Sequence, residues 1–167
     1  MSNPVKQIVL FGVLLVLVGA LTLMSYEKEM TLATGQVVLL ELAPVDPRSL
    51  LQGDYMALRY RLAQTLRGEA LPRDGKLVVT LDENGVAAFK RVYSGEPLSP
   101  GELLLRYRKR SNGIRLGAES FFFQEGHAGD YRGAKYGELR VSGSGDSVLA
   151  GLRGQERERL GEGYNKK

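Results

Sequence analysis

The stretch Lys76–Tyr93, KLVVTLDENGVAAFKRVY, decides the fold class of this 167-residue chain. Two runs rich in apolar residues, 76–81 and 86–93, flank the turn sequence Asp-Glu-Asn-Gly at 82–85. An Asn-Gly pair between two such runs suits a hairpin turn, because its central residues readily adopt positive φ angles. The stretch therefore predicts two antiparallel strands.

The same pattern of a short strand followed by a turn recurs along the chain. The further runs are 36–43, 55–62, 102–110, 114–123, 137–141 and 147–152. Ser-Asn-Gly at 111–113 and Ser-Gly-Ser-Gly-Asp at 142–146 are the turn sequences of two more hairpins. About seven strands joined by tight turns predict an all-β fold, as an antiparallel barrel or sandwich.

An uncharged apolar run, Ile8–Met24, precedes these strands. Its seventeen residues span roughly 26 Å as a helix, enough to cross the hydrocarbon core of a bilayer. Lys6 precedes the run and net negative charge follows it at 27–29, so we expect the N-terminus in the cytoplasm and the remainder outside. Two alternatives stay open: a cleaved signal peptide, although 23–26 offers no small-x-small site, and a buried core helix.

These observations divide the chain into four parts. We expect an N-terminal membrane anchor at 1–25, a linker at 26–34, an extracytoplasmic β-domain at 35–153 and a flexible charged tail at 154–167. The anchor would make the chain a single-pass membrane protein, with its N-terminus in the cytoplasm and its C-terminal domain outside.

Composition excludes several kinds of site. The chain has no cysteine and one histidine, which excludes a thiolate zinc site, a cysteine nucleophile and a histidine-rich metal site. We therefore predict no metal and no cofactor. The net charge of +4 is spread along the chain, and a domain outside the cell is not expected to bind nucleic acid.

The loop between the first two strands contains residues suited to special turns. Pro47 fixes its own φ angle, and Gly53 tolerates a left-handed turn. Asp46 and Asp54 can accept hydrogen bonds from turn amides, and Arg48 lies between them in sequence. The loop is either architectural or part of a binding surface.

The strand that follows the loop begins at Tyr55. Met56, Leu58, Tyr60 and Leu62 fall on one face of it at a period of two residues. The architectural interpretation is that leucine and tyrosine fill the core behind a turn. The functional interpretation is a ligand or partner surface built on the loop and Tyr55.

The run GDYMALRY at 53–60 matches every fixed position of the GDYXXLXY family, which this chain resembles. The resemblance extends to ESFFFQEG at 119–126 and YGELRV at 136–141, and covers roughly 35–152. It implies a membrane-associated bacterial domain, often accompanying a polytopic membrane protein. Together with the anchor, it places the chain in the bacterial inner (cytoplasmic) membrane, with the C-terminal domain periplasmic or otherwise extracytoplasmic. We therefore expect an accessory or binding subunit, held to membrane lipid through 8–24, that docks on such a protein or on an envelope ligand.

Within this hypothesis, Glu125 is a further candidate site residue. It lies in the block 119–126 that carries the resemblance. Arg48 could pair with Asp54 or Glu125 to lock the loop, and such a pairing would make Arg48 structural.

A hydrolase is the second hypothesis. Type I signal peptidases are anchored extracytoplasmic β-domains with a Ser-Met-x-Pro motif before Gly-Asp, and a later strand with a catalytic lysine followed by arginine and valine. The chain resembles them in Gly53-Asp54 and in Phe-Lys-Arg-Val at 89–92. A Ser–Lys dyad needs a hydroxyl within reach of a neutral lysine, and the candidates are Ser49 and Lys90. The family's nucleophile position, however, falls near Val45.

The run 102–110 separates a basic face from an apolar one. Leu103, Leu105 and Tyr107 alternate with Arg106, Arg108 and Arg110. The basic face is either a solvated sheet face or a contact with lipid headgroups or an acidic partner.

Three consecutive phenylalanines at 121–123 break the two-residue alternation of a strand. At least one of them should therefore face away from the core. We expect a turn at 124–126 beside it, and the stretch either fills the core or leaves an apolar docking patch.

Overall fold

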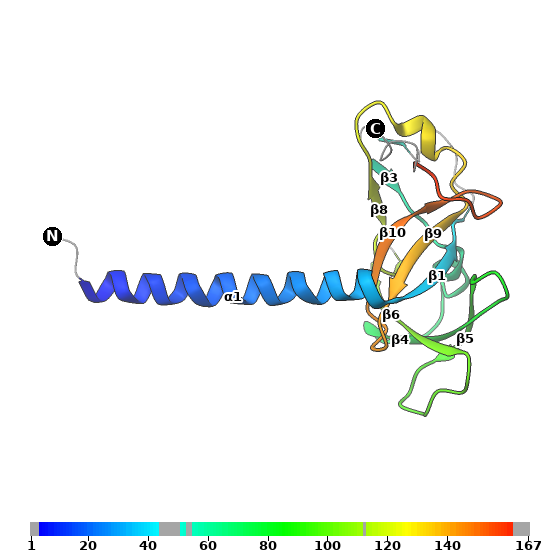
Figure 1. The fold of residues 1–167 in the computed structure, drawn as a ribbon. Helices are drawn as coiled ribbons and strands as arrows, with labels where there is room; N and C mark the ends of the chain where they lie inside the picture. The colour runs from blue at the N-terminus through cyan, green and yellow to red at the C-terminus, as the bar shows by residue number, and fades with distance from the viewer. Residues whose placement is uncertain (1–3, 44–50, 53–54, 112, 162–167) are drawn as a thin grey trace.

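The structure is a computed structural model that describes residues 4–43, 51–52, 55–111 and 113–161. One long N-terminal helix stands away from a β-domain, which lies at its C-terminal end (Figure 1). Over the described residues the domain contains ten strands, in place of the roughly seven expected, because several are only two or three residues long. All strand pairs within its three sheets are antiparallel.

Helix α1 (Pro4–Thr34) contains the predicted apolar run and is long and apolar enough to cross a membrane. None of its most apolar stretch is buried against the domain. The stretch 26–34, expected as a linker, forms the last turns of this helix. It contains no glycine or proline that would interrupt the helix.

The helix joins the domain through Gly35. The Gly35 amide donates to the Thr31 carbonyl at 2.9 Å, and the Arg140 guanidinium donates to the Gly35 carbonyl at 3.2 Å. Gly35 is buried, and a Cβ there would collide with the Thr31 carbonyl oxygen. The chain therefore passes from helix to strand without a flexible spacer.

The three sheets have simple orders. The first is β1 (Gln36–Glu41), β9 (Tyr136–Val141) and β10 (Ser147–Arg153), in the order β1-β9-β10. The second is β5 (Ala87–Val92), β4 (Asp74–Leu81), β6 (Glu102–Arg110) and β7 (Gly113–Arg115), in the order β5-β4-β6-β7. The third is β2 (Leu51–Gln52), β3 (Tyr55–Ala57) and β8 (Ser120–Phe122), in the order β2-β3-β8.

The predicted hairpins β4–β5 and β9–β10 are confirmed. In the first, the Asn84 and Val86 amides both donate to Asp82 Oδ1 at 2.8 Å. Gly85 follows with a φ of +77°, which glycine adopts without strain. Local turn chemistry is therefore sufficient to define this hairpin.

Two predicted strands are wrong in extent. The run 114–123 is divided between β7 and β8, which pair with different neighbours, because the chain bends at Gly117 with a φ of +80°. The run 55–62 stops short of its expected end, since helix α3 (Arg61–Thr65) begins directly after Tyr60. Leucine, alanine and glutamine at 62–64 are good helix formers.

One hydrophobic core serves all three sheets. Its largest fully buried side chains include Leu40, Leu77, Leu105, Tyr107 and Leu139. The sheets are also connected through their backbones: the Leu39 amide donates to Gly85, the Ala43 amide to Arg59 and the Arg106 amide to Gly145. The three sheets therefore share one hydrophobic core.

The C-terminal segment expected as a flexible tail returns to the domain as far as Gly161. The Leu160 amide donates to the Leu152 carbonyl at 3.0 Å, and the Leu160 side chain packs on the core. Arg159 reaches the buried Glu138. A buried carboxylate needs cationic or hydrogen-bonding partners, and this segment supplies one.

Candidate functional site

The second half of the GDYXXLXY motif lies in the core. Leu58 and Tyr60 are 4% and 2% exposed, and the Tyr60 hydroxyl donates to the Ala118 carbonyl at 2.7 Å. Burial raises the pKa of Tyr60 well above its ordinary value, and the nearby Glu119 carboxylate adds to this. Both side chains therefore fill the core.

Tyr55, the first tyrosine of the motif, lies near the surface instead. It pairs across the sheet with Phe122, and the two ring centroids are 5.8 Å apart. Phe122 is 74% exposed, whereas Phe121 and Phe123 pack against Tyr131 at centroid distances of 4.9 and 5.5 Å. This confirms that one phenylalanine of the triplet faces away from the core.

Several predicted site residues lie outside the described part of the chain. They are Asp46, Pro47, Arg48, Ser49, Gly53 and Asp54. Glu125 is described, and it is exposed in a turn that follows β8. A binding surface that joins the loop to Glu125 therefore stays a prediction.

Lys90 forms an ion pair with Glu102. Its Nζ lies 2.9 Å from Glu102 Oε1, and about half of its side chain is exposed. Glu102 is buried and also accepts hydrogen bonds from Arg91 and the Ser99 amide. The bond from Lys90, followed by that from Ser99, holds the pKa of Glu102 below its usual value. A dyad would require a desolvated, neutral lysine instead.

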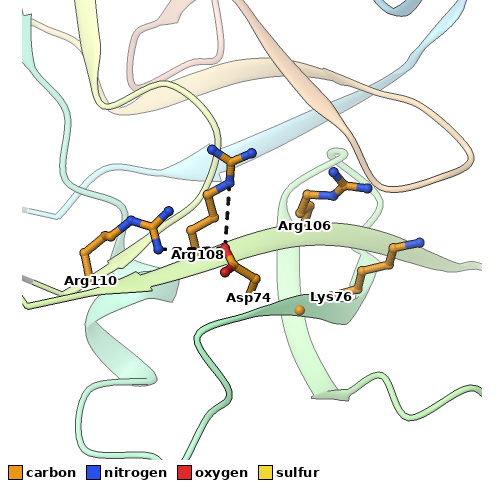
Figure 2. Close-up of a pocket in the computed structure, with 6 residues that line it drawn as sticks. Asp74, Lys76, Arg106, Arg108 and Arg110 are labelled. Carbon is orange, nitrogen blue, oxygen red and sulfur yellow. Dashed lines mark ion pairs between the residues drawn. The ribbon is translucent and has the colours of Figure 1, made fainter.

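The outer face of β4 and β6 carries a group of basic side chains (Figure 2). Leu105 and Tyr107 point into the core, so that their neighbours Arg106, Arg108 and Arg110 point outward. This is the separation of faces that the sequence predicted. The described residues around a hollow of about 550 Å³, which we call the β6 hollow, are Asp74, Gly75, Lys76, Arg106, Arg108 and Arg110.

A second hollow, of about 300 Å³, lies beside the end of α1, and we call it the helix-side hollow. Its described lining residues are Lys28, Arg106, Arg108, Arg110, Arg115, Gly117, Asp146 and Ser147. Five cations thus surround one carboxylate in the part of the chain that the structure describes. Sequence reasoning missed Lys28, because a linker was expected at its position.

The ion pairs around these two hollows are weak. Arg106 lies 3.1 Å from Asp146, and Arg115 lies 3.0 Å from Glu119. Arg108 and Arg110 approach Asp74 only to 3.9 and 3.8 Å, and the dashed lines in Figure 2 mark these two contacts. Exposed pairs of this kind contribute little to stability and leave most guanidinium N–H groups available to other acceptors. The face can therefore bind an anion.

A long apolar helix joined to a small β-domain with a basic face defines the class of protein: a β-domain with one candidate membrane-spanning helix. A family model described as GDYXXLXY protein matches residues 17–152, and the chain belongs to this family. No curated protein and no solved structure matches the chain.

Proposed function

We propose that the chain is a single-pass protein of the bacterial inner membrane, with its N-terminus in the cytoplasm and its β-domain on the other side. The β-domain acts as an accessory or binding subunit that docks on a polytopic membrane protein or an envelope ligand. The three sheets form one barrel-like unit in this proposal, supported by the common core and by the hydrogen bonds between sheets.

The exposed Phe122, which packs on the half-buried Tyr55, carries the proposal for docking. Exposed apolar patches mark interaction sites, and aromatic residues are enriched at the centres of interfaces. Phe122 contributes to a hollow that also contains Lys28 of α1. The patch therefore lies beside the end of the helix.

The position of Lys28 favours a partner that is itself in the membrane. Lys28 follows Met24, the end of the apolar run, by four residues, which is about 6 Å along a helix. The polar zone of a bilayer is about 5–8 Å thick on each side. A protein that covers Phe122 would therefore lie at the membrane surface, which suits the outer loops of a polytopic protein.

Affinity purification of the full chain in mild detergent tests this function. We expect a membrane protein to be recovered in a constant ratio to the chain, and to be lost with Phe122→Ser. Leu98→Ser is a matched control, because Leu98 is another exposed apolar residue, outside this hollow. Failure to recover any partner, or equal loss with both variants, would contradict docking through this patch.

A further inference from the structure

We propose that the helix-side hollow binds the phosphate-bearing headgroup of an anionic phospholipid in the membrane that α1 crosses. This inference rests on the anchoring part of the proposed function and adds a ligand to the domain.

The charge of the described residues that line the hollow favours the binding of an anion. Among the described lining residues, the cations are Lys28, Arg115 and the three outward arginines of β6, and the carboxylate is Asp146. Glu119 and Asp74, which are not among the lining residues, pair with some of these arginines, and Glu27 and Glu29 flank Lys28 in sequence. Within the lining itself, cations outnumber carboxylates by five to one.

The chemistry of the lining suits phosphate. Guanidinium groups present planar pairs of N–H donors that match phosphate oxygens, and lysine adds a compact charge. A hollow of about 300 Å³ has the volume of about ten water molecules. This is enough for a phosphate group with a small substituent such as glycerol.

The position of the hollow relative to the bilayer suits a lipid headgroup. Lys28 is one of its lining residues, and it stands at headgroup height by the length argument above. The outward arginines of β6 therefore meet the layer in which the phosphates of a bilayer lie. Basic residues at this level attract anionic lipids.

The neighbouring hollow gives the site an amphipathic character. Lys28 and Ser147 line both the helix-side hollow and the hollow that contains Phe122. The hollow that contains Phe122 is also lined by Phe121 and Leu149. A cationic site thus adjoins an apolar one. This arrangement fits a molecule with a charged head and an apolar tail, and favours a phospholipid over an acidic protein segment.

The test uses the full chain in mild detergent, with native mass spectrometry to count bound lipid. The probes are short-chain phosphatidylglycerol, short-chain phosphatidylcholine and free glycerol phosphate. The test variant is Arg106→Gln/Arg108→Gln/Arg110→Gln. The control variant Arg59→Gln/Arg67→Gln/Arg132→Gln removes the same charge from exposed arginines outside the hollow.

We expect phosphatidylglycerol to bind at least about tenfold more tightly than phosphatidylcholine. Each basic residue at the surface contributes roughly a fivefold gain, so the test variant should lose on the order of a hundredfold. The control variant should stay within about twofold of the wild type. The control variant alters exposed side chains, and the test variant alters two exposed arginines and the half-buried Arg110. Circular dichroism checks that both variants remain folded.

Three results would overturn the inference: equal binding of the two lipids, equal loss in both variants, or glycerol phosphate binding as tightly as phosphatidylglycerol. The last would indicate a site for soluble phosphates. A protein partner that is lost with the test variant, without any lipid preference, would assign the face to an acidic partner. Alkaline carbonate extraction separates these outcomes from a failure of anchoring, because an anchored chain stays with the membrane.

Discussion

Arginines gather at two places in this protein, and their surroundings differ. At the first, Glu138 is 1% exposed and receives Arg153 at 2.7 Å and Arg159 at 3.0 Å. At the second, the helix-side hollow, the described cations outnumber the carboxylates. In the first cluster, the charge of Glu138 is balanced by arginines of the same chain. These ion pairs connect β9 with β10 and with the C-terminal segment. The second cluster lies on an exposed face with few carboxylates in its described lining, and for this reason we propose that it binds an anion.

The pKa of Glu138 also reflects its pairing with the two arginines. Burial of this carboxyl by itself would raise its pKa. The hydrogen bonds from Arg159 and Arg153, together with their charges, outweigh burial, so that the pKa of Glu138 lies below its ordinary value. The carboxylate therefore stays charged at neutral pH and stabilises the fold.

Glu138→Ala should have the largest effect on stability. It removes the anion between two arginines, and breaking a buried ion pair costs about 3 kcal/mol. Urea unfolding of the full chain in detergent measures the change in the free energy of unfolding. The control Glu156→Ala changes an exposed residue and should stay within about 0.5 kcal/mol of the wild type. Equal effects in both variants would show that the Glu138 cluster is not structural.

A pair of single substitutions compares the two arginine clusters directly. Arg159→Gln should lower the free energy of unfolding by about 1–2 kcal/mol, because it weakens a charged hydrogen bond to a buried carboxylate. Arg108→Gln should change it by less than about 0.5 kcal/mol, since its contact with Asp74 is long and exposed. If Arg108→Gln destabilises the fold as much as Arg159→Gln, the basic face is structural.

The third prediction concerns the loss of folding stability at low pH. A carboxyl whose pKa is lowered on folding stabilises the protein above its unfolded pKa, about 4.3 for glutamate. This stability is lost as the pH falls through the lower pKa of the folded state. Thermal unfolding between pH 6 and pH 3 should therefore show a smaller loss in Glu138→Gln than in the wild type. Part of the loss should remain, because the pKa of Glu102 is lowered as well.

The smallest expected effect is that of Asp146→Asn. Asp146 is the carboxylate of the helix-side hollow, and its ion pair with Arg106 is partly exposed. Stability should change by less than about 0.5 kcal/mol. Binding of phosphatidylglycerol should tighten by about fivefold, since the competing anion is removed. Weaker lipid binding in this variant would contradict the proposed site.

Much of the local structure could be predicted from the sequence. Asn84-Gly85 defined the β4–β5 hairpin, and the alternation in 102–110 separated the arginines from the core. The phenylalanine triplet predicted one exposed ring, which is Phe122. These features depend on residues that are neighbours in the sequence, so a local sequence pattern is enough to predict them.

The sites themselves could not be predicted, because they join distant residues. Lys28 lines the same hollow as the β6 arginines only because α1 continues without a break to Thr34. Glu138 meets Arg159 only because the C-terminal segment returns to the domain.

By itself, the sequence determined an apolar helix, a series of strands and turns, and family membership, since backbone geometry and hydrophobic periodicity act over a few residues. The tertiary structure decided which charges are satisfied within the chain and which face outward. That outcome depends on packing between elements, which brings together residues that no local pattern relates.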